Sequence, residues 1–423
     1  MKPKKIKIKD SVNLYYIPTK KFKTTAFSIY IHRPLTREEC TLNSLLSMVI
    51  RRGCPMFPES KELSRYLDGL YGVSFATSVR KKAERQIICA NFQFVNEKFL
   101  EEKEDILVKV LELAGDAVLN QSSFNEEYVR QEKENLKLQI LSVINDKRQY
   151  ASKRCIEIMC EGEPYGISKT GYTEDLESID AAVLFDHYKN VVLKSPMDIF
   201  VSGDTDIDYI TEKVKNMFDG INVTCEVPEP ADVRKDVEKV RNVTEEQQIV
   251  QGKLSIGFRT GVFESDNEYP AMMMYNSILG CGIFSKLFNN VREKLSLCYY
   301  ASSSVDYLKG IMTINSGIEV ENFQKAYDEI FVQMEDIKNG NISDTEMSAA
   351  VLGTINSIKS VSDNPFITDD YYLGKIIAGS PLALDELAGK ISSVTKEQIM
   401  EVAKKVQLDT VFFLKGSDLH GKV

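Results

Sequence analysis

The chain has 423 residues, of which 43% are hydrophobic and 27% are charged, an ordinary composition for a soluble globular protein. This length allows two or three domains with full cores. The formal net charge of −9 argues against nucleic acid as the main partner, because phosphate binding needs a basic surface. No secretory leader opens the sequence, and no apolar run approaches the ~18 residues that span a bilayer, so we expect a cytoplasmic protein without membrane contact.

The first expected elements are strands and one helix. Alternating lysine and isoleucine over residues 5–9 predict an opening strand, and residues 27–31 predict another. Residues 41–54 have the spacing of an amphipathic helix that ends at a glycine C-cap, Gly53. A second amphipathic helix is expected around residues 129–140.

The eight cysteines are scattered along the chain and form no C-x-x-C pair. This pattern favours free thiols in a reducing cytosol over a disulfide framework. Cys155 and Cys160 lie five residues apart, a poor spacing for a shared metal ion. We expect both in a hydrophobic core, where free cysteine is common.

Four segments of the first half recur in the same order in the second half. Residues 27–31 resemble 254–258, residues 70–74 resemble 297–301, residues 95–99 resemble 320–323, and residues 200–204 resemble 413–417. Because the offset between the copies drifts little, the sequence predicts two copies of one α+β unit.

We expect an N-terminal domain over residues 1–218, an exposed linker over 219–247 and a C-terminal domain over 248–423. The linker contains Pro228 and Pro230 and many charged residues. Strands and helices do not alternate regularly within each copy, which favours a mainly antiparallel sheet with helices on one face. Two unrelated α+β domains are the alternative interpretation.

The duplication and the helix at residues 41–54 together resemble the pitrilysin-type metallopeptidases over nearly the whole chain. In that family the helix carries the H-x-x-E-H motif, which supplies zinc ligands and a general base. The corresponding positions here are Ser44, Ser47 and Met48. None of these side chains is a plausible zinc ligand or base at neutral pH. The resemblance therefore implies a degenerate zinc site.

The helix at residues 129–140 also resembles this family. Active members place two glutamates seven residues apart, about two helical turns, and the later one is the third zinc ligand. Glu132 occupies the earlier position and Gln139 the later one. Because a neutral amide is a poor replacement for a carboxylate ligand, we expect no metal or cofactor on this chain.

The histidines give no alternative zinc site. His32, His187 and His420 are the only three, and none lies three or four residues from another. We expect structural or surface roles for all of them. An enzyme using a cysteine nucleophile, Cys54 or Cys281, would need a nearby base, and the sequence places no histidine beside either.

A third segment, residues 285–299, resembles the helix-to-strand segment of the family's C-terminal domain. There, an arginine and a tyrosine seven residues apart contact substrate and help to polarise the scissile carbonyl. Arg292 and Tyr299 keep that spacing. A guanidinium offers fixed donors to a peptide carbonyl, and a phenol can stabilise an oxyanion. The alternative is that Arg292 pairs with a local carboxylate and Tyr299 packs in the sheet.

The resemblance implies a non-catalytic, substrate-binding subunit of a two-chain zinc peptidase, with no enzyme activity of its own. The partner would be a homologous H-x-x-E-H subunit that holds the zinc, in a heterodimer. Without that partner, the alternative arrangement is a homodimer of this chain. The substrate would be a peptide or unfolded protein, bound extended by strand addition to a sheet edge. A scaffold or binding protein with no role in peptide hydrolysis is the alternative.

Overall fold

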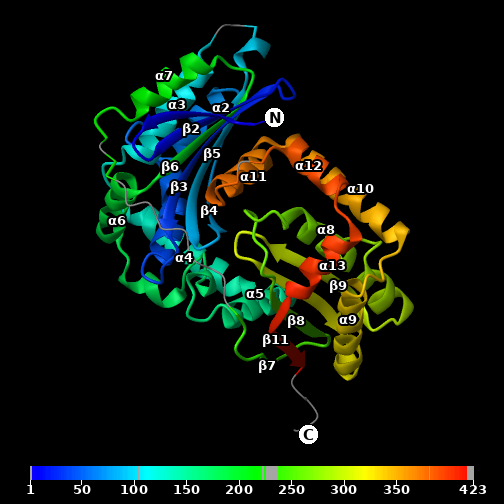
Figure 1. Cartoon of the computed structure of the whole chain (residues 1–423). Helices are drawn as coiled ribbons and strands as arrows, with labels where there is room; N and C mark the ends of the chain where they lie inside the picture. The colour runs from blue at the N-terminus through cyan, green and yellow to red at the C-terminus, as the bar shows by residue number, and fades with distance from the viewer. Residues whose placement is uncertain (1, 102–103, 222, 225–235, 381, 417–423) are drawn as a thin grey trace. The chain divides into compact units, whose positions relative to one another are not determined.

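Figure 1 shows the computed structural model of the chain, which describes residues 2–101, 104–221, 223–224, 236–380 and 382–416. The chain forms two compact units. Unit 1 contains Met1–Leu141, Ile167–Ala231 and Asp363–Gly374, and unit 2 contains Ser142–Gly166, Asp232–Ser362 and Lys375–Val423. Within the described ranges, no helix is both long and apolar enough to cross a membrane.

Unit 1 is built on a six-stranded sheet with the order β1-β2-β6-β3-β5-β4. Strands β2 and β6 run parallel, and the other neighbours are antiparallel. The strands are β1 (Lys4–Lys9), β2 (Val12–Pro18), β3 (Thr24–Pro34), β4 (Ser74–Lys82), β5 (Arg85–Val95) and β6 (Met197–Gly203).

One face of this sheet is covered by helices. Side chains alternate along a strand, and Phe27, Ile29 and Ile31 of β3 share one hydrophobic core with the helices. The helices that contribute to this core are α1 (Cys40–Val49), α2 (Ser60–Gly69), α3 (Ile106–Leu119), α4 (Glu126–Ser142), α6 (Ala181–Lys194) and α7 (Ile207–Met217).

Unit 2 is built on a five-stranded sheet with the order β7-β11-β8-β10-β9. Its strands are β7 (Arg241–Gln247), β8 (Gly252–Arg259), β9 (Cys298–Asp306), β10 (Ile311–Ile318) and β11 (Gln407–Gly416). Its helices include α5 (Lys147–Met159), α8 (Tyr269–Gly280), α9 (Phe323–Lys338), α10 (Asp344–Ser360), α12 (Leu384–Ser392) and α13 (Lys396–Lys405).

The two sheets repeat one topology. The order β2-β6-β3-β5-β4 corresponds to β7-β11-β8-β10-β9, and the β7–β11 pair is parallel like β2–β6. The matched segments 27–31 and 254–258 lie on β3 and β8, and the matched segments 200–204 and 413–417 lie at the ends of β6 and β11. Ser417 lies outside the described residues. The predicted α+β fold with two repeats and mainly antiparallel sheets is confirmed.

Each unit also contains a segment from the other half of the sequence. Helix α5 belongs to unit 2, and most of α11 (Pro365–Ile377) belongs to unit 1. A Cβ at Gly257 of β8 would lie 2.8 Å from Sδ of Met159, so this glycine allows α5 to approach the sheet. The two contiguous domains expected from sequence, 1–218 and 248–423, do not account for this exchange of α5 and α11. Part of the expected linker, residues 222 and 225–235, lies outside the described residues.

Buried polar groups hold both exchanged segments. Asp369 of α11 accepts hydrogen bonds of 2.9 Å from Ser28 and from Ser202, and burial raises the pKa of its carboxyl to about 7. In unit 2, burial opposes ionisation of Glu163, but hydrogen bonds from Arg259 and Lys309 outweigh it and hold its pKa at about 2. Both segments are therefore integral to the unit that contains them.

Candidate functional site

The helix expected at residues 41–54 is α1, followed by a 3-10 turn, Ile50–Arg52. Gly53 occupies the C-cap of that turn, as expected, but with an extended φ of 172°. A Cβ at Gly53 would lie 2.5 Å from the carbonyl oxygen of Pro58. Close approach of the backbone, and not a left-handed cap, is therefore the physical reason for glycine here.

The three degenerate positions of α1 are turned into the protein. Ser44 and Ser47 are each 2% exposed, and Met48 is half-buried. The hydroxyl of Ser44 donates to the carbonyl of Lys169 at 2.8 Å, and that of Ser47 donates to the carbonyl of Ser44 at 2.8 Å. Both hydroxyls are thus engaged with backbone carbonyls and are not presented to solvent.

A loop at residues 167–175 covers α1. The side-chain amide of Gln86 donates to the carbonyl of Lys169 at 2.6 Å, and the backbone N–H of Tyr172 donates to Oγ1 of Thr41 at 3.0 Å. Gly171 has a φ of 79°, and a Cβ there would lie 2.2 Å from Oγ1 of Thr41. Only glycine combines this left-handed backbone with so close an approach to α1.

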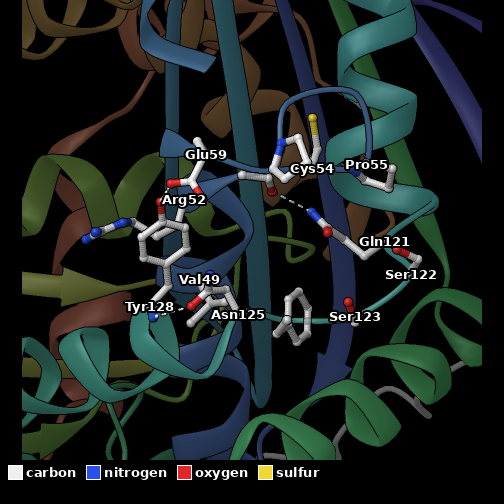
Figure 2. A pocket seen from close by; sticks show the side chains of 13 residues that line it. Val49, Arg52, Cys54, Pro55, Glu59, Gln121, Ser122, Ser123, Asn125 and Tyr128 are labelled. Carbon is white, nitrogen blue, oxygen red and sulfur yellow. Dashed lines mark hydrogen bonds between the residues drawn. The ribbon is translucent and has the colours of Figure 1, made fainter. Parts of the chain in front are cut away.

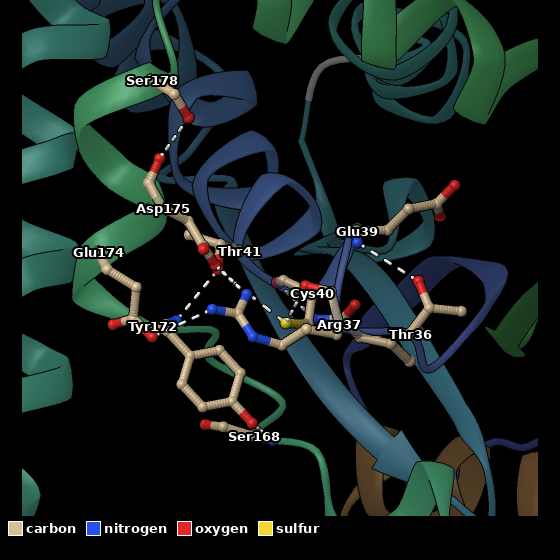
Figure 3. A network of polar contacts seen from close by, with 11 residues as sticks. Thr36, Arg37, Glu39, Cys40, Thr41, Ser168, Tyr172, Glu174, Asp175 and Ser178 are labelled. Atoms are coloured by element: carbon tan, nitrogen blue, oxygen red, sulfur yellow. Dashed lines mark hydrogen bonds and ion pairs between the residues drawn. The ribbon is translucent and has the colours of Figure 1, made fainter.

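Figure 3 shows the charged network that fixes this loop. Arg37 pairs with Asp175 at 2.5 Å, and its guanidinium lies 4.0 Å from the ring centre of Tyr172. Burial opposes ionisation of Asp175, but hydrogen bonds from Arg37 and Thr41 outweigh it and lower the pKa of the carboxyl. Burial raises the pKa of the Cys40 thiol beside them. These contacts hold the loop at residues 167–175 against the start of α1.

The helix expected at residues 129–140 is part of α4. Glu132 is 5% exposed and pairs with Arg52 at 2.6 Å, and Arg52 also donates to Gln131 at 2.7 Å. Gln139 is exposed, whereas the three α1 positions are buried or half-buried. The four positions that the resemblance assigns to the zinc ligands and the base therefore do not face solvent together.

This donor set does not fit zinc. Ser44, Ser47, Met48 and Gln139 offer two buried hydroxyls, a thioether and an exposed amide, whereas zinc is bound in proteins by imidazole, thiolate and carboxylate groups. Among the described residues, no group of three or more His, Cys, Asp or Glu side chains is placed to hold a metal.

The two described histidines have structural partners. Nε2 of His32 lies 3.0 Å from Oδ2 of Asp198, and both side chains are buried. Nε2 of His187 lies 2.8 Å from Oδ1 of Asn43, and burial lowers the pKa of His187 to about 4. His420 lies outside the described residues.

A cavity of about 390 Å³ lies between the C-terminal end of α1 and the start of α4 (Figure 2). We call it the polar cavity; among the residues that line it are Arg52, Cys54, Glu59, Gln121, Asn125 and Tyr128.

The polar groups of this cavity mostly bond to one another. The hydroxyl of Tyr128 donates to Glu59 at 2.9 Å, and the amide of Gln121 donates to the carbonyl of Gly53 at 2.8 Å. Burial raises the pKa of the Cys54 thiol to about 12. A thiol with that pKa is a poor nucleophile at neutral pH, which argues against the cysteine-enzyme alternative at this position.

Arg292 lies on a π-helical segment, Leu287–Lys294, in which the N–H of Leu295 donates to the carbonyl of Asn290 at 3.1 Å. π-helical turns are rare and frequent at functional sites. The guanidinium lies 4.7 Å from the ring centre of Phe288 and 3.5 Å from Oε1 of Glu293, and the side chain is 41% exposed. It is therefore available for a further partner.

Tyr299 lies on β9, an edge strand of its sheet, and is 62% exposed. Its hydroxyl donates to Oε1 of Glu319 at 2.8 Å, and this hydrogen bond raises the pKa of the phenol. The side chain does not pack within the sheet. No hydrogen bond or ring contact joins Tyr299 to Arg292 among the described residues.

Sequence reasoning missed the loop at residues 167–175 and the Arg52–Glu132 pair. Gly171 beside an aromatic residue was the available signal for a tight approach, but a single glycine does not identify its neighbour. The partner of Arg52 lies 80 positions away, and no local pattern indicates it.

Known proteins resemble this chain in sequence. A family model described as the peptidase M16 inactive domain matches residues 178–353. A Bacillus subtilis (strain 168) protein described as the probable inactive metalloprotease YmfF is 34% identical over 408 residues, covering 96% of each chain.

Solved structures share the fold over the full length. A conserved protein from Enterococcus faecalis V583 has a TM-score of 0.90 at 29% identity and covers 99% of both chains. A peptidase M16 inactive domain from Pseudomonas fluorescens has a TM-score of 0.82 at 14% identity, again over 99% of both chains. The second likeness bears on the fold alone.

Proposed function

The chain belongs to the pitrilysin-type, or M16, peptidase family, as an inactive homologue, and from this premise we propose that it is the non-catalytic, substrate-binding subunit of a two-chain zinc peptidase. The observation that carries the proposal is the state of α1. Ser44, where the family's spacing would put a zinc ligand, is buried against the backbone carbonyl of Lys169. A side chain in that position has neither the chemistry nor the access for peptide hydrolysis.

The role of Arg292 and Tyr299 in this proposal is to bind the peptide and polarise its carbonyl. Their exposure supports it, because both side chains can reach a ligand without unfolding their elements. Tyr299 would have to exchange Glu319 for a substrate oxygen, and its raised pKa keeps the phenol protonated and able to donate.

The peptide would bind in an extended form. Strand β9 lies at the edge of its sheet and carries Tyr299, so a peptide paired to this edge would run past the tyrosine. The substrate class that fits is a peptide or an unfolded protein segment. The net charge of −9 gives no basis for nucleic-acid binding.

The partner would be a homologue of similar length that carries H-x-x-E-H and holds the zinc, in a heterodimer. A homodimer would form only in its absence. We place the complex in the cytoplasm, because the seven cysteines in the described part of the chain are all free thiols. Cys225 lies outside the described residues.

The test is peptide hydrolysis by this chain, by its H-x-x-E-H homologue from the same organism, and by the mixture, with zinc quantified in each. We expect hydrolysis from the mixture, and a loss of kcat/KM of about tenfold to hundredfold on Arg292→Gln or Tyr299→Phe. Arg130→Gln and Tyr209→Phe are matched controls, because both residues are exposed and bonded to carboxylates.

A scaffold role is the second candidate, and the engagement of Tyr299 with Glu319 favours it. In that case the mixture would hydrolyse peptides equally well with Arg292→Gln, Tyr299→Phe and the control variants. If the mixture is no more active than the homologue alone, the subunit proposal is wrong.

A further inference from the structure

A second cavity of about 390 Å³ lies in unit 2, between the C-terminal end of α8, the turn that follows it, and α10. We call it the apolar cavity. Much of its wall is formed by Met273, Ile278, Ile283, Phe284, Ala349 and Ala350. Ile283 and Phe284 are 62% and 59% exposed. Large apolar side chains so exposed at the wall of a cavity are typical of binding sites.

Two hydroxyl groups in this cavity have no hydrogen-bond partner in the part of the chain that the structure describes. Thr354 of α10 is 8% exposed, and Tyr307 is half-buried beside Tyr269, with ring centres 5.0 Å apart. Neither hydroxyl makes a hydrogen bond with any residue that the structure describes. Thr354 and Tyr307 both line the cavity. A hydroxyl without a protein partner can donate a hydrogen bond to a ligand atom in the cavity, or accept one from it.

The cavity offers no unpaired charge. Glu346 is the one charged residue of its lining, and it pairs with Lys286 at 2.9 Å and accepts a hydrogen bond from the hydroxyl of Ser343 at 2.7 Å. A charged ligand group would therefore lose hydration without gaining a counter-charge. The walls and the two free hydroxyls fit an uncharged apolar group with a polar atom beside it, which is the composition of an apolar residue in a peptide chain.

Gly353 is one of the residues that line the cavity. It lies within α10, where glycine costs helix stability relative to alanine, and a Cβ there would meet nothing within 4 Å. The packing of this chain against itself therefore does not require glycine at this position. A side chain at residue 353 would occupy space that a ligand could otherwise use.

From these features we propose that the apolar cavity binds one apolar side chain of an extended peptide, while Thr354 and Tyr307 bond to the adjoining peptide backbone. This inference rests on the proposed peptide-binding function and adds a preference for apolar residues to it. The site is distinct in sequence from Arg292 and Tyr299.

Cys281 provides a local readout, because it lines the cavity and is the exposed one among the described cysteines. The probe is an acetylated and amidated heptapeptide, Ser-Gln-Ser-Phe-Ser-Gln-Ser, with an analogue that has Ala in place of Phe. The measurement is the rate at which N-ethylmaleimide labels Cys281, located by mass spectrometry. At about 1 mM peptide, a site with a dissociation constant of about 1 mM is half occupied and labelling slows about twofold.

The full-length chain should be protected by the Phe peptide and not by the Ala peptide. Gly353→Leu should abolish the protection, because the added side chain fills the cavity. Gly389→Leu is the matched control, since Gly389 lies in α12 and a Cβ there also meets nothing within 4 Å. Thr354→Val is a second variant, and it should weaken protection by removing one hydroxyl at constant shape.

Fluorescence anisotropy of a labelled Phe peptide separates the ways in which the proposal could fail. Peptide that binds without protecting Cys281, or whose protection survives Gly353→Leu, would overturn the apolar site and leave the peptide-binding function standing. Absence of binding by either measurement would overturn both.

Discussion

Each repeat contains a cavity of about 390 Å³ beside the helix that follows a central strand of its sheet. The polar cavity lies at the end of α1 and the start of α4, and the apolar cavity lies at the end of α8 and along α10. Helix α1 directly follows β3 and α8 directly follows β8, the corresponding strands of the two sheets. A polar cavity therefore lies beside the first of these helices, and beside the second lies an apolar cavity with two hydroxyls that have no partner among the described residues.

The polar groups near these two cavities differ in whether they bond within the protein. In the first repeat, Arg52, Glu132 and the loop at residues 167–175 use the polar groups around α1 to hold the unit together. In the second, the hydroxyls of Thr354 and Tyr307 have no partner within the described ranges. We infer that the first repeat has become a structural support and that the second retains the capacity to bind a ligand.

The largest expected effect is at the polar cavity. Glu132→Gln leaves Arg52 without a counter-charge in a mostly buried setting, and breaking such a pair costs about 3–5 kcal/mol. Urea unfolding measures the change. Glu127→Gln on the same helix is the matched control, because its pair with Arg130 is exposed and should contribute little to stability. A loss of less than about 1 kcal/mol for Glu132→Gln would contradict a structural role.

The next effect is at the loop that covers α1. Gly171→Ala adds a Cβ 2.2 Å from Oγ1 of Thr41 and forces a non-glycine residue to a φ of 79°. We expect a loss of about 2–3 kcal/mol from left-handed strain and overpacking together. Gly72→Ala is the control, with a φ of 74° and nothing within 4 Å, and should lose only about 1 kcal/mol. Equal losses in thermal or urea unfolding would mean that the loop does not press on α1.

A smaller effect, of opposite sign, is expected at the apolar cavity. Gly353→Ala should stabilise the chain by about 1 kcal/mol, because alanine favours helix and its methyl group meets open space. Gly280→Ala, at the end of α8, should destabilise it, because a Cβ there would lie 2.4 Å from the backbone nitrogen of Ser303. A loss of stability on Gly353→Ala would show that the chain itself uses this space.

The mildest probe compares the thiols of the two cavities without changing the sequence. Cys54 is 3% exposed, and burial raises its pKa to about 12, so its thiolate fraction at pH 8 is on the order of 10⁻⁴. Labelling of Cys54 should be slow at pH 8 and should rise about tenfold per pH unit while the protein stays folded, whereas exposed Cys281 should react readily at pH 8. Comparable rates at pH 8 would contradict the contrast between the cavities.

Much of the fold followed from sequence because the same strands occur twice. Residues 27–31 and 254–258 alternate apolar side chains in both copies, and both lie on strands at corresponding places in their sheets. The exchange of α5 and α11 was not predictable. An amphipathic pattern indicates that one face of a helix is buried, but it does not indicate which sheet that face packs against. Sequence also indicated a helix near Arg292 but not its π-helical hydrogen bonding.

The degenerate positions could be named from sequence, but not their surroundings. Ser44, Ser47, Met48 and Gln139 follow from the family's spacing, which remains their only support as former zinc positions. The burial of Ser44 against Lys169 depends on a loop 125 residues away. Both cavities depend on such long-range packing, so composition and periodicity gave no sign of them.

The most direct test of a non-catalytic subunit is the zinc content of the purified full-length chain after equilibration with zinc and removal of excess metal, measured together with peptide hydrolysis in the presence and absence of a chelator. A non-catalytic subunit should retain only substoichiometric zinc and show no hydrolysis, while a mixture with its H-x-x-E-H homologue hydrolyses peptides. One tightly held zinc ion per chain, with chelator-sensitive hydrolysis by this chain alone, would contradict the central claim.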